Sequence, residues 1–259
     1  MEVNFLARSR TTLVVQHTIR LTDHLVRVHL GGPGFDAFQP NDFTDAYVKL
    51  AFPGADGEVM RTYTVRAVDP AAREIVIDFV YHGDEGVAGP WAVNAEPGDT
   101  IDVQGPGGAY APRADADWHL LAGDESALPA IAAACAALPS DAVGHVVIEI
   151  DGPADKLAFP YPEGIELTWV YRGDAQPGEK LAAAVRAQPW LDGQVQVFIH
   201  GEAQAVMHDL RPYIRKERGI SAEWASSISG YWRRGRTEEG FRRWKSELAE
   251  TERATPAAV

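Results

Sequence analysis

The feature that most constrains the fold is a change of pattern near residue 113. Before it, six short segments rich in β-branched or aromatic residues are separated by turns of Gly, Pro and Asp. This spacing predicts a small antiparallel barrel, a fold that leaves few sheet edges exposed. After it, buried strand-like segments alternate with helices, which predicts a parallel sheet. We therefore expect a six-stranded antiparallel β-barrel over residues 1–113 and a parallel-sheet α/β domain over residues 114–259.

The expected elements follow from local composition and from the Gly, Pro, Asp and Asn residues that bound them. Barrel strands are expected at residues 12–19, 24–30, 46–52, 59–66, 74–81 and 100–104. In the second half, strands are expected at 118–123, 145–150, 165–171 and 194–200, and helices at 127–138, 178–187 and 203–217. The Trp- and Arg-rich end of the chain is expected to form a basic helical segment.

Charge and composition exclude several classes of protein. The formal net charge of −13 argues against general binding of nucleic acids or anionic membranes. Residues 211–245 differ, with ten Lys or Arg against four Asp or Glu, which indicates either a local site for a small anion or a solvated helical face. No apolar run approaches the roughly 20 residues that span a bilayer, and from the lack of an unbroken apolar segment near residue 1 we expect no signal peptide. We expect a cytoplasmic protein.

One strand-like stretch, Arg61-Thr62-Tyr63-Thr64-Val65-Arg66, concentrates groups suited to a cofactor. Strand side chains alternate, so Arg61 and Tyr63 share one face with Val65 while the other three share the opposite face. Arg binds phosphate through paired hydrogen bonds, Thr adds a hydroxyl, and Tyr can lie against a planar ring. The stretch therefore fits a cofactor with a flat head and a phosphate tail. An ordinary half-exposed strand uses the same residue types and stays open as an alternative.

Two further regions could approach a ligand. Gly86 and Gly89 allow close backbone approach in the loop before the sixth barrel strand, where a helix N-terminus could receive a phosphate. In the parallel sheet, ligands bind at the carboxyl ends of strands. Those ends are expected at residues 123–126, Asp151, residues 172–173 and residues 201–202.

These stretches together resemble the siderophore-interacting protein family, the FAD-dependent ferric-siderophore reductases of the ferredoxin-reductase-like superfamily. The resemblance is carried in order by RTYTVR at 61–66, by HG at 82–83 with GVAGPWA at 86–92, by LAGDESALP at 121–129, and by GYWRRG at 230–235. Each motif alone is weak, but their order and the barrel-then-α/β pattern make the set specific.

The resemblance implies that the barrel binds FAD and that the second half receives NAD(P)H. No residue is required as a strict catalyst, and no metal ligands are expected. The implied FAD-binding residues are Arg61, Thr62, Tyr63, Thr64, His82, Val87, Ala88, Trp91 and Ala92. The implied NAD(P)H-binding and neighbouring residues are Gly123, Asp124, Glu125, Ser126, Gly201, Glu202, Ala203, Tyr231 and Trp232.

The implied substrate is a ferric siderophore, with Lys49, Arg233 and Arg234 as candidate contacts to a negatively charged chelate. Relatives in the family carry a basic residue in the Gly-Pro-x-Gly turn, whereas residues 105–108 here read Gly-Pro-Gly-Gly. Relatives also place a Ser and a basic residue before the Trp of the flavin loop, where this chain has neither. One phosphate contact therefore falls to backbone amides.

Two functions stay open at this point. The first is an NAD(P)H-dependent reductase of ferric siderophores. The second is a flavin-bearing electron-transfer or siderophore-binding module that receives electrons from a partner, such as a ferredoxin-type protein. The nicotinamide preference is also open, because Asp151 could pair with a ribose 2′-OH while Arg172 could meet a 2′-phosphate.

Overall fold

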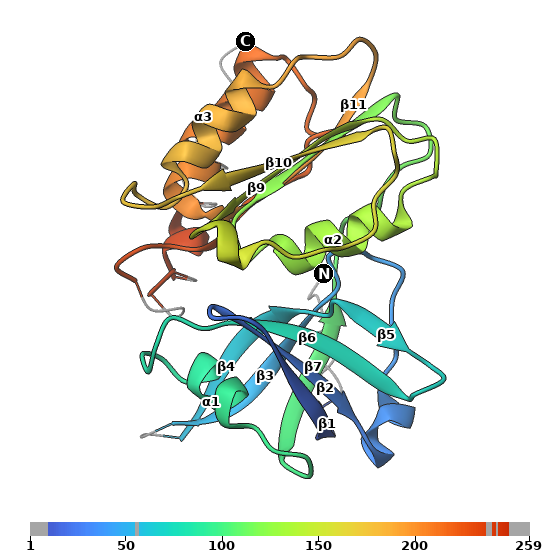
Figure 1. Cartoon of the computed structure of the whole chain (residues 1–259), viewed down its shortest axis with the longest axis vertical. Coiled ribbons are helices and arrows are strands. Elements are labelled where there is room, and N and C mark those ends of the chain that lie inside the picture. Colours follow the sequence, from blue (N-terminus) through green and yellow to red (C-terminus); the bar gives the residue numbers. More distant parts are fainter. Residues whose placement is uncertain (1–9, 55–56, 237–239, 242, 249–259) are drawn as a thin grey trace, which may run out of the picture.

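The structure is a computed structural model that describes residues 10–54, 57–236, 240–241 and 243–248. It contains two sheets, one above the other in Figure 1, with helix α2 (Leu128–Ala137) lying between them. The first sheet comprises β1 (Arg10–Thr22), β2 (Leu25–Gly31), β3 (Tyr47–Gly54), β4 (Gly57–Thr64), β5 (Ala67–Asp69), β6 (Glu74–Val80) and β7 (Thr100–Gly107). A short 3₁₀ helix, η1 (Pro33–Ala37), follows β2, and α1 (Ala88–Asn94) precedes β7.

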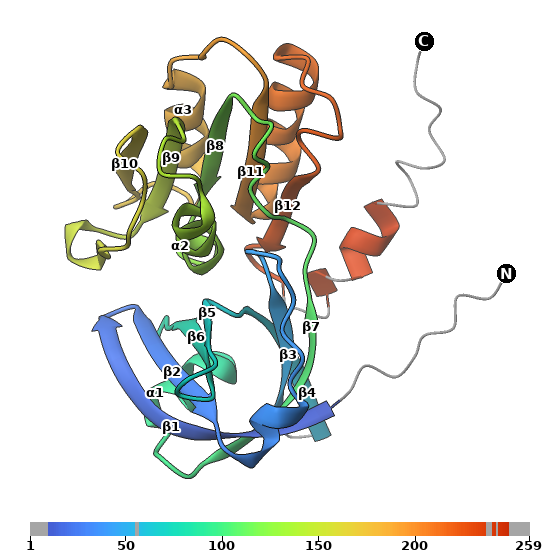
Figure 2. The ribbon, with the colours of Figure 1, turned by 90° about the vertical axis from the view of Figure 1, so that its right-hand side faces the viewer.

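The first sheet is antiparallel and strongly curled (Figure 2), with strand order β4-β3-β7-β1-β2-β6-β5. The prediction of an N-terminal antiparallel barrel is confirmed, but the described sheet has seven strands and not six. The additional strand is β5, which directly follows the strand expected at residues 59–66. Strand β4 ends at Thr64, and the chain crosses to β5 on the opposite edge of the sheet. The Val65 N–H donates to the Ala46 carbonyl (2.7 Å) and the Arg66 N–H donates to the Val76 carbonyl (2.8 Å), so this crossing draws the two edges together.

Alternation of side chains gives the curled sheet one buried face. Leu13 and Val15 of β1, and Val28 and Leu30 of β2, are at most 1% exposed and face a common core. Their neighbours along each strand are more polar and face outward, as expected for a sheet with one buried face.

The second sheet is parallel, with order β10-β9-β8-β11-β12. Its strands are β8 (Trp118–Gly123), β9 (Gly144–Ile150), β10 (Ile165–Tyr171), β11 (Val195–Glu202) and β12 (Ser227–Trp232). Helix α3 (Glu179–Ala187) and the short 3₁₀ helix η2 (Pro153–Asp155) complete the crossovers. Strands β8 and β10 have the bounds predicted from sequence.

The predicted helix at 203–217 is confirmed, because all of these residues are helical. Most of it is π-helical, in η3 (Gln204–Leu210) and η4 (Tyr213–Glu217), with Pro212 between them. The expectation for the C-terminal segment was wrong. Residues 227–232, placed in a helical C-terminal segment, form strand β12, which pairs with β11. Helix is present further on, at the described residues 240–241 and 243–248.

The two sheets pack against each other through α2. Leu25 of β2 belongs to the same buried cluster as Leu128, Ile131 and Cys135 of α2, and Val80 of β6 packs against that cluster. A helix covered on both sides must be apolar all round, which explains the Ala-rich composition of α2. Within the described part of the chain, no helix has the length and apolarity needed to cross a membrane.

Candidate functional site

The concave side of the curled sheet carries an aromatic cluster. The Tyr63 ring lies 4.4 Å from Phe79, and Trp91 lies 5.6 Å from Phe79 and 5.5 Å from Phe52. Beside it is a cavity of about 450 Å³. Its lining comprises Phe52, Pro53, Val87, Pro90, Trp91, Asn94, Ala95 and Asp99. An apolar cavity with a few polar groups at its rim is the usual setting for a planar ligand.

Strand register separates the predicted residues of β3 and β4 into two groups. Tyr63 lies opposite Val48 and Arg61 lies opposite Leu50, and both partners are fully buried on the core side. Lys49 lies opposite Thr62, on the other face. Arg61 and Tyr63 are therefore on one face, as predicted, whereas Lys49 and Thr62 are on the outer face.

Helix α1 holds its alanines in the core. Ala88 and Ala92 are 5% and 0% exposed and belong to the core cluster of the curled sheet. Their side chains contribute to packing, so only their backbone is left to meet a ligand. Because α1 has only seven residues, the expected phosphate site at its N-terminus has little support. Trp91 and Val87 line the cavity instead.

A second cavity, of about 350 Å³, lies where the two halves meet. His82 belongs to it and is separated from Trp91, although both were predicted along the FAD. Burial, more than the neighbouring charges, lowers the pKa of His82 and keeps the ring neutral at pH 7. The cavity is lined by Asp23, His24, Tyr81, His82, Gly83, Glu125, Asp151 and Arg172.

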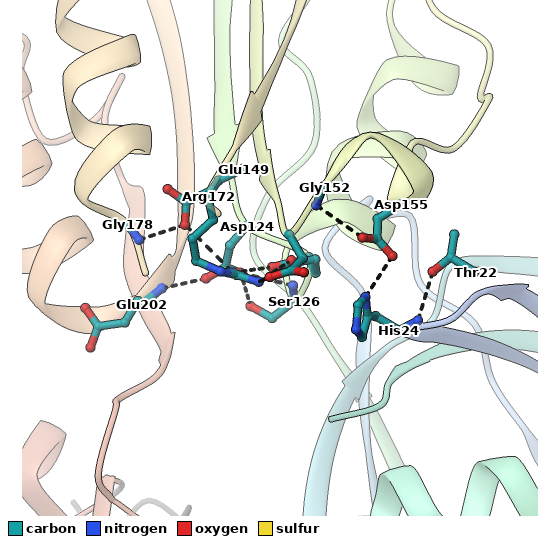
Figure 3. Close-up of polar contacts among 12 residues, drawn as sticks. Thr22, His24, Asp124, Ser126, Glu149, Gly152, Asp155, Arg172, Gly178 and Glu202 are labelled. Atoms are coloured by element: carbon teal, nitrogen blue, oxygen red, sulfur yellow. Dashed lines mark hydrogen bonds and ion pairs between the residues drawn. The ribbon is translucent and has the colours of Figure 1, made fainter. Parts of the chain in front are cut away.

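Asp124 joins three strand ends of the parallel sheet. It is 1% exposed, and its Oδ2 accepts a hydrogen bond from the Glu202 N–H (2.9 Å; Figure 3). The same oxygen accepts a second hydrogen bond from the Trp232 indole (2.8 Å). Its Oδ1 accepts from the backbone and hydroxyl of Ser126. Burial is the main reason that the pKa of Asp124 rises to about 6, with the nearby Glu125 charge adding to it. A Cβ on Gly201 would lie 2.7 Å from Oδ2, so glycine is needed for this approach.

The residues around Asp124 are also largely buried. Glu202 is 4% exposed and accepts from the Gln204 N–H (2.6 Å), and Ala203 is fully buried. Tyr231 packs on His200, with ring centroids 4.3 Å apart. The predicted nucleotide residues are therefore brought together, but most of them hold the strand ends in place. Glu125 and Ser126 lie nearer the surface.

Arg172, at the end of β10, is bound by carboxylates. Its Nη1 and Nη2 donate to the two oxygens of Glu125 (3.1 and 2.9 Å), and Nη2 also donates to Asp151 (3.0 Å). Behind it lies Glu149, fully buried, with its nearest oxygen 3.9 Å from Nη1. Glu149 accepts from the Gly178 and Leu181 N–H groups (2.8 and 2.9 Å), which anchors the first turn of α3. Burial lowers the pKa of Arg172, but its acidic partners outweigh burial and raise the pKa above its ordinary value.

Comparison with known proteins identifies the family. The siderophore-interacting protein model matches residues 116–235, and the siderophore-interacting FAD-binding domain model matches residues 51–110. The chain belongs to the siderophore-interacting protein family. This confirms FAD as the cofactor, oxidoreductase chemistry as the class, and the resemblance drawn from the four motifs.

Individual members of this family are similar over most of the chain. A Mycobacterium tuberculosis protein is 56% identical over 92% of this chain and 95% of its own length. The ferric vibriobactin reductase ViuB of Vibrio cholerae is 33% identical, covering 85% and 88%. An NADPH-dependent ferric-chelate reductase of Escherichia coli is 29% identical, covering 66% and 74%. The crystal structure of a siderophore utilization protein from T. fusca superposes with a TM-score of 0.81 at 36% identity, covering 91% and 97%.

The residues of this siderophore-interacting protein fit FAD on the concave side of the curled sheet. The Tyr63 ring offers a planar surface, and Arg61 on the same face carries the charge that a pyrophosphate needs. The adjoining cavity supplies apolar walls from Phe52 and Trp91. Aromatic face, guanidinium and apolar cavity therefore occur together, as a flavin dinucleotide requires.

The predicted substrate residues of the C-terminal segment lie just after β12. The Arg233 guanidinium lies over the Trp244 ring at 4.1 Å, and its Nη1 is buried without a hydrogen-bond partner among the described residues. The backbone N–H of Arg234 donates to the Glu202 carboxylate (3.3 Å), and Arg234 is exposed to solvent. Both arginines thus follow the strand that brings Trp232 to Asp124.

Sequence reasoning missed Glu149 and Asp155. The signal for Glu149 was a lone acid inside an otherwise apolar strand, which is rarely buried unless it has partners. Asp155 is 6% exposed, and its Oδ1 lies 2.9 Å from His24 Nδ1, so this hydrogen bond links η2 to the β1–β2 turn (Figure 3). Nothing local in the sequence indicates that contact, because it joins residues 131 positions apart.

Histidine and carboxylate groups come together at two places. His17, His29 and Glu74 form one group, and His24, Asp151 and Asp155 form the other, with one ligand atom from each residue within 4.8 Å of the others. The His17 and His29 rings are stacked 3.9 Å apart, so their in-plane lone pairs lie side by side and do not converge on one point. This geometry gives no support for a shared metal ion in the first group.

Proposed function

We propose that the protein is an NAD(P)H-dependent flavoenzyme that reduces ferric siderophores and releases iron as Fe(II) in the cytoplasm. Siderophores hold Fe(III) through hard oxygen donors, and reduction to Fe(II) weakens that binding. A nicotinamide gives up two electrons as a hydride, whereas iron accepts one at a time. Bound FAD supplies the chemistry that connects a two-electron donor to a one-electron acceptor.

The observation that carries this proposal is that one cavity is lined by both halves of the chain. Tyr81 and His82 follow β6 of the curled sheet, whereas Glu125, Asp151 and Arg172 lie at the strand ends of the parallel sheet. A nucleotide held at those strand ends would therefore lie beside the FAD-binding half. This supports direct electron delivery from NAD(P)H within one chain.

In this proposal the chain's own residues bind and orient their ligands. Tyr63 positions the flavin ring, and Arg61 holds the phosphate side of FAD. Thr64, predicted beside them, is 9% exposed and lies on the same face of β4 as Thr62, so its role is weaker. Residues 1–113 form the FAD-binding domain, and residues 114–259 form the NAD(P)H-binding domain with its basic C-terminal segment. The wider assignments to Thr62, His82, Ala88 and Ala92 are weaker, because their side chains face elsewhere or are buried.

Lys49, Arg233 and Arg234 are proposed to meet the negatively charged siderophore. Lys49 lies on the opposite face of the sheet from Tyr63, so it does not compete for the flavin. The buried Nη1 of Arg233 lacks a partner among the described residues, and an anionic group would satisfy it. These three cations would give an anionic siderophore a local binding site on a chain that otherwise carries a net negative charge.

The test is an anaerobic reaction of FAD-loaded protein with NADH or NADPH, followed by a ferric siderophore and an Fe(II)-specific chromophore. Bleaching of the flavin absorbance by nicotinamide, then its recovery with formation of the Fe(II) complex, is expected. Flavin that stays oxidised with both nicotinamides, but is reduced by a reduced ferredoxin, would instead support the carrier function. A preparation that neither contains nor takes up flavin contradicts both.

The FAD assignment has a separate control in the same half. Tyr63→Ala should lower FAD affinity about tenfold or more, because it removes the aromatic face, whereas Lys49→Ala on the outer face should leave FAD affinity within about twofold. Fluorescence titration of apoprotein with FAD measures both. Equal losses in the two variants would contradict the assignment of the concave face.

A further inference from the structure

The cavity between the two halves has a charge balance that bears on its nucleotide. Among its lining residues, Asp23, Glu125 and Asp151 are acidic and Arg172 is the only cation apart from two histidines. With neutral histidines the lining carries a net charge of −2. Asp155 adds a further carboxylate within 4.8 Å of the His24 and Asp151 ligand atoms. The cavity is therefore acidic.

The one cation is already neutralised. Both Arg172 side-chain nitrogens that reach the cavity are engaged by Glu125 in a paired arrangement, and Asp151 takes a second bond from Nη2. The Arg172 side chain is 15% exposed and the Glu125 side chain is 11% exposed, so this pairing is screened little by solvent. A phosphate could bind Arg172 only by displacing a carboxylate from a favourable bidentate contact.

Asp151 is placed differently. It follows β9, the strand next to β8, and its side chain is 49% exposed. In sheets of this kind an acid after the second strand accepts hydrogen bonds from an adenosine ribose 2′-OH, whereas the 2′-phosphate of NADPH requires a cation at that place. The Lys156 ammonium lies over the Tyr171 ring (5.4 Å) and the Lys180 ammonium donates to the Tyr171 carbonyl (3.0 Å), and neither lysine lines the cavity.

Building on the proposed function, we infer that the electron donor of this chain is NADH and that Asp151 is the residue that rejects NADPH. Asp151 offers an acceptor to a free 2′-OH and repels a 2′-phosphate. Glu125 and Asp151 together hold Arg172 away from the role that a cation plays in NADPH-specific sites. The E. coli relative is named for NADPH, so the inference separates this chain from that relative.

The test is a direct binding measurement on FAD-loaded protein, with NAD⁺ and NADP⁺ as unreactive probes, by calorimetry and by thermal shift. The wild-type protein should bind NAD⁺ at least about tenfold more tightly than NADP⁺. Asp151→Asn keeps the shape and removes one charge, so it should tighten NADP⁺ about tenfold and change NAD⁺ by no more than a few fold. Glu125→Gln combined with Asp151→Asn should tighten NADP⁺ further, because Arg172 is then released.

The matched control is Asp141→Asn, an equal change of charge at an exposed position before β9, at the opposite end of that strand. It should leave both affinities unchanged, and if it shifts NADP⁺ as much as Asp151→Asn does, net charge and not this site sets the preference. Equal binding of NAD⁺ and NADP⁺ by the wild type overturns the inference but leaves the reductase proposal standing. Selective NAD⁺ binding without iron reduction supports the NADH preference and contradicts the reductase proposal. Binding of neither nucleotide contradicts both the NADH preference and the reductase proposal.

Discussion

Two carboxylates at adjacent strand ends, Asp124 after β8 and Asp151 after β9, serve opposite purposes. Asp124 is 1% exposed and accepts four hydrogen bonds, from Ser126 (twice), Glu202 and Trp232. The Asp151 side chain is 49% exposed and accepts one hydrogen bond among the described residues, from Arg172. The two residues occupy similar positions at the ends of neighbouring strands, but only Asp151 has carboxylate lone pairs left to bind a ligand. A carboxylate whose lone pairs are all used by the protein's own donors supports the fold, whereas one with free lone pairs can bind a ligand.

The largest test of this contrast is thermodynamic. Asp124→Asn places an amide N–H₂ against donors that need an acceptor, and buried unsatisfied donors each cost about 1–3 kcal/mol. We expect the free energy of unfolding to fall by about 2–4 kcal/mol. Asp151→Asn, at a half-exposed site, should change it by no more than about 0.5 kcal/mol. Urea unfolding of both variants measures the difference, and equal losses would remove the distinction between the two acids.

The next test uses pH. Burial raises the pKa of Asp124 to about 6, above its ordinary value of 3.8, so the folded state holds a proton that the unfolded chain has released. Its contribution to stability is therefore complete below about pH 4 and is lost as pH rises to about 6. Unfolding free energies at pH 4, 5, 6 and 7 should show this loss in the wild type and a smaller one in Asp124→Asn. Burial also raises the pKa of Glu149, which keeps some slope in the variant. A wild-type slope retained in Asp124→Asn would place the titration elsewhere.

The sequence predicts the strands that have a local signal and misses the strand that depends on tertiary pairing. Strands β8 and β10 were predicted with correct bounds because an apolar run followed by Gly or by Arg and Gly is a local signal. Strand β12 was missed because Ser227, Ser229 and Gly230 break the pattern, and only pairing with β11 makes it a strand. Tertiary pairing of this kind overrides local propensity.

The sequence motifs identified the residues of the site, but they did not show which of these residues support the fold and which face a ligand. Asp124 and Glu202 looked like nucleotide ligands because they end parallel strands, yet the fold turns them inward. Lys49 was assigned to the siderophore and Tyr63 to the flavin, and only the strand register shows that the two lie on opposite faces of the sheet. The pairing of Arg172 with Glu125 joins residues 47 positions apart, so no window of sequence could show that this cation is engaged.

The smallest expected effect isolates one of the four bonds to Asp124. Trp232→Phe keeps an aromatic ring at the end of β12 but removes the indole N–H that donates to Oδ2 at 2.8 Å. The loss in unfolding free energy should be about 1–2 kcal/mol, a net hydrogen bond to a charged group plus some lost packing. Trp169→Phe is the matched control. The Trp169 ring packs edge-on to Phe159, its indole forms no hydrogen bond among the described residues, and the residue is half-buried.

The Trp232→Phe variant also tests the pKa of Asp124. Because the Trp232 indole bond favours the ionised carboxylate, its removal should raise the Asp124 pKa further, so the pH at which stability levels off moves upward. Trp169→Phe should leave that pH where it is. If the two variants behave alike in both measurements, the Trp232 indole does not act through Asp124, and the strand ends are held by the donors of Ser126 and Glu202 alone.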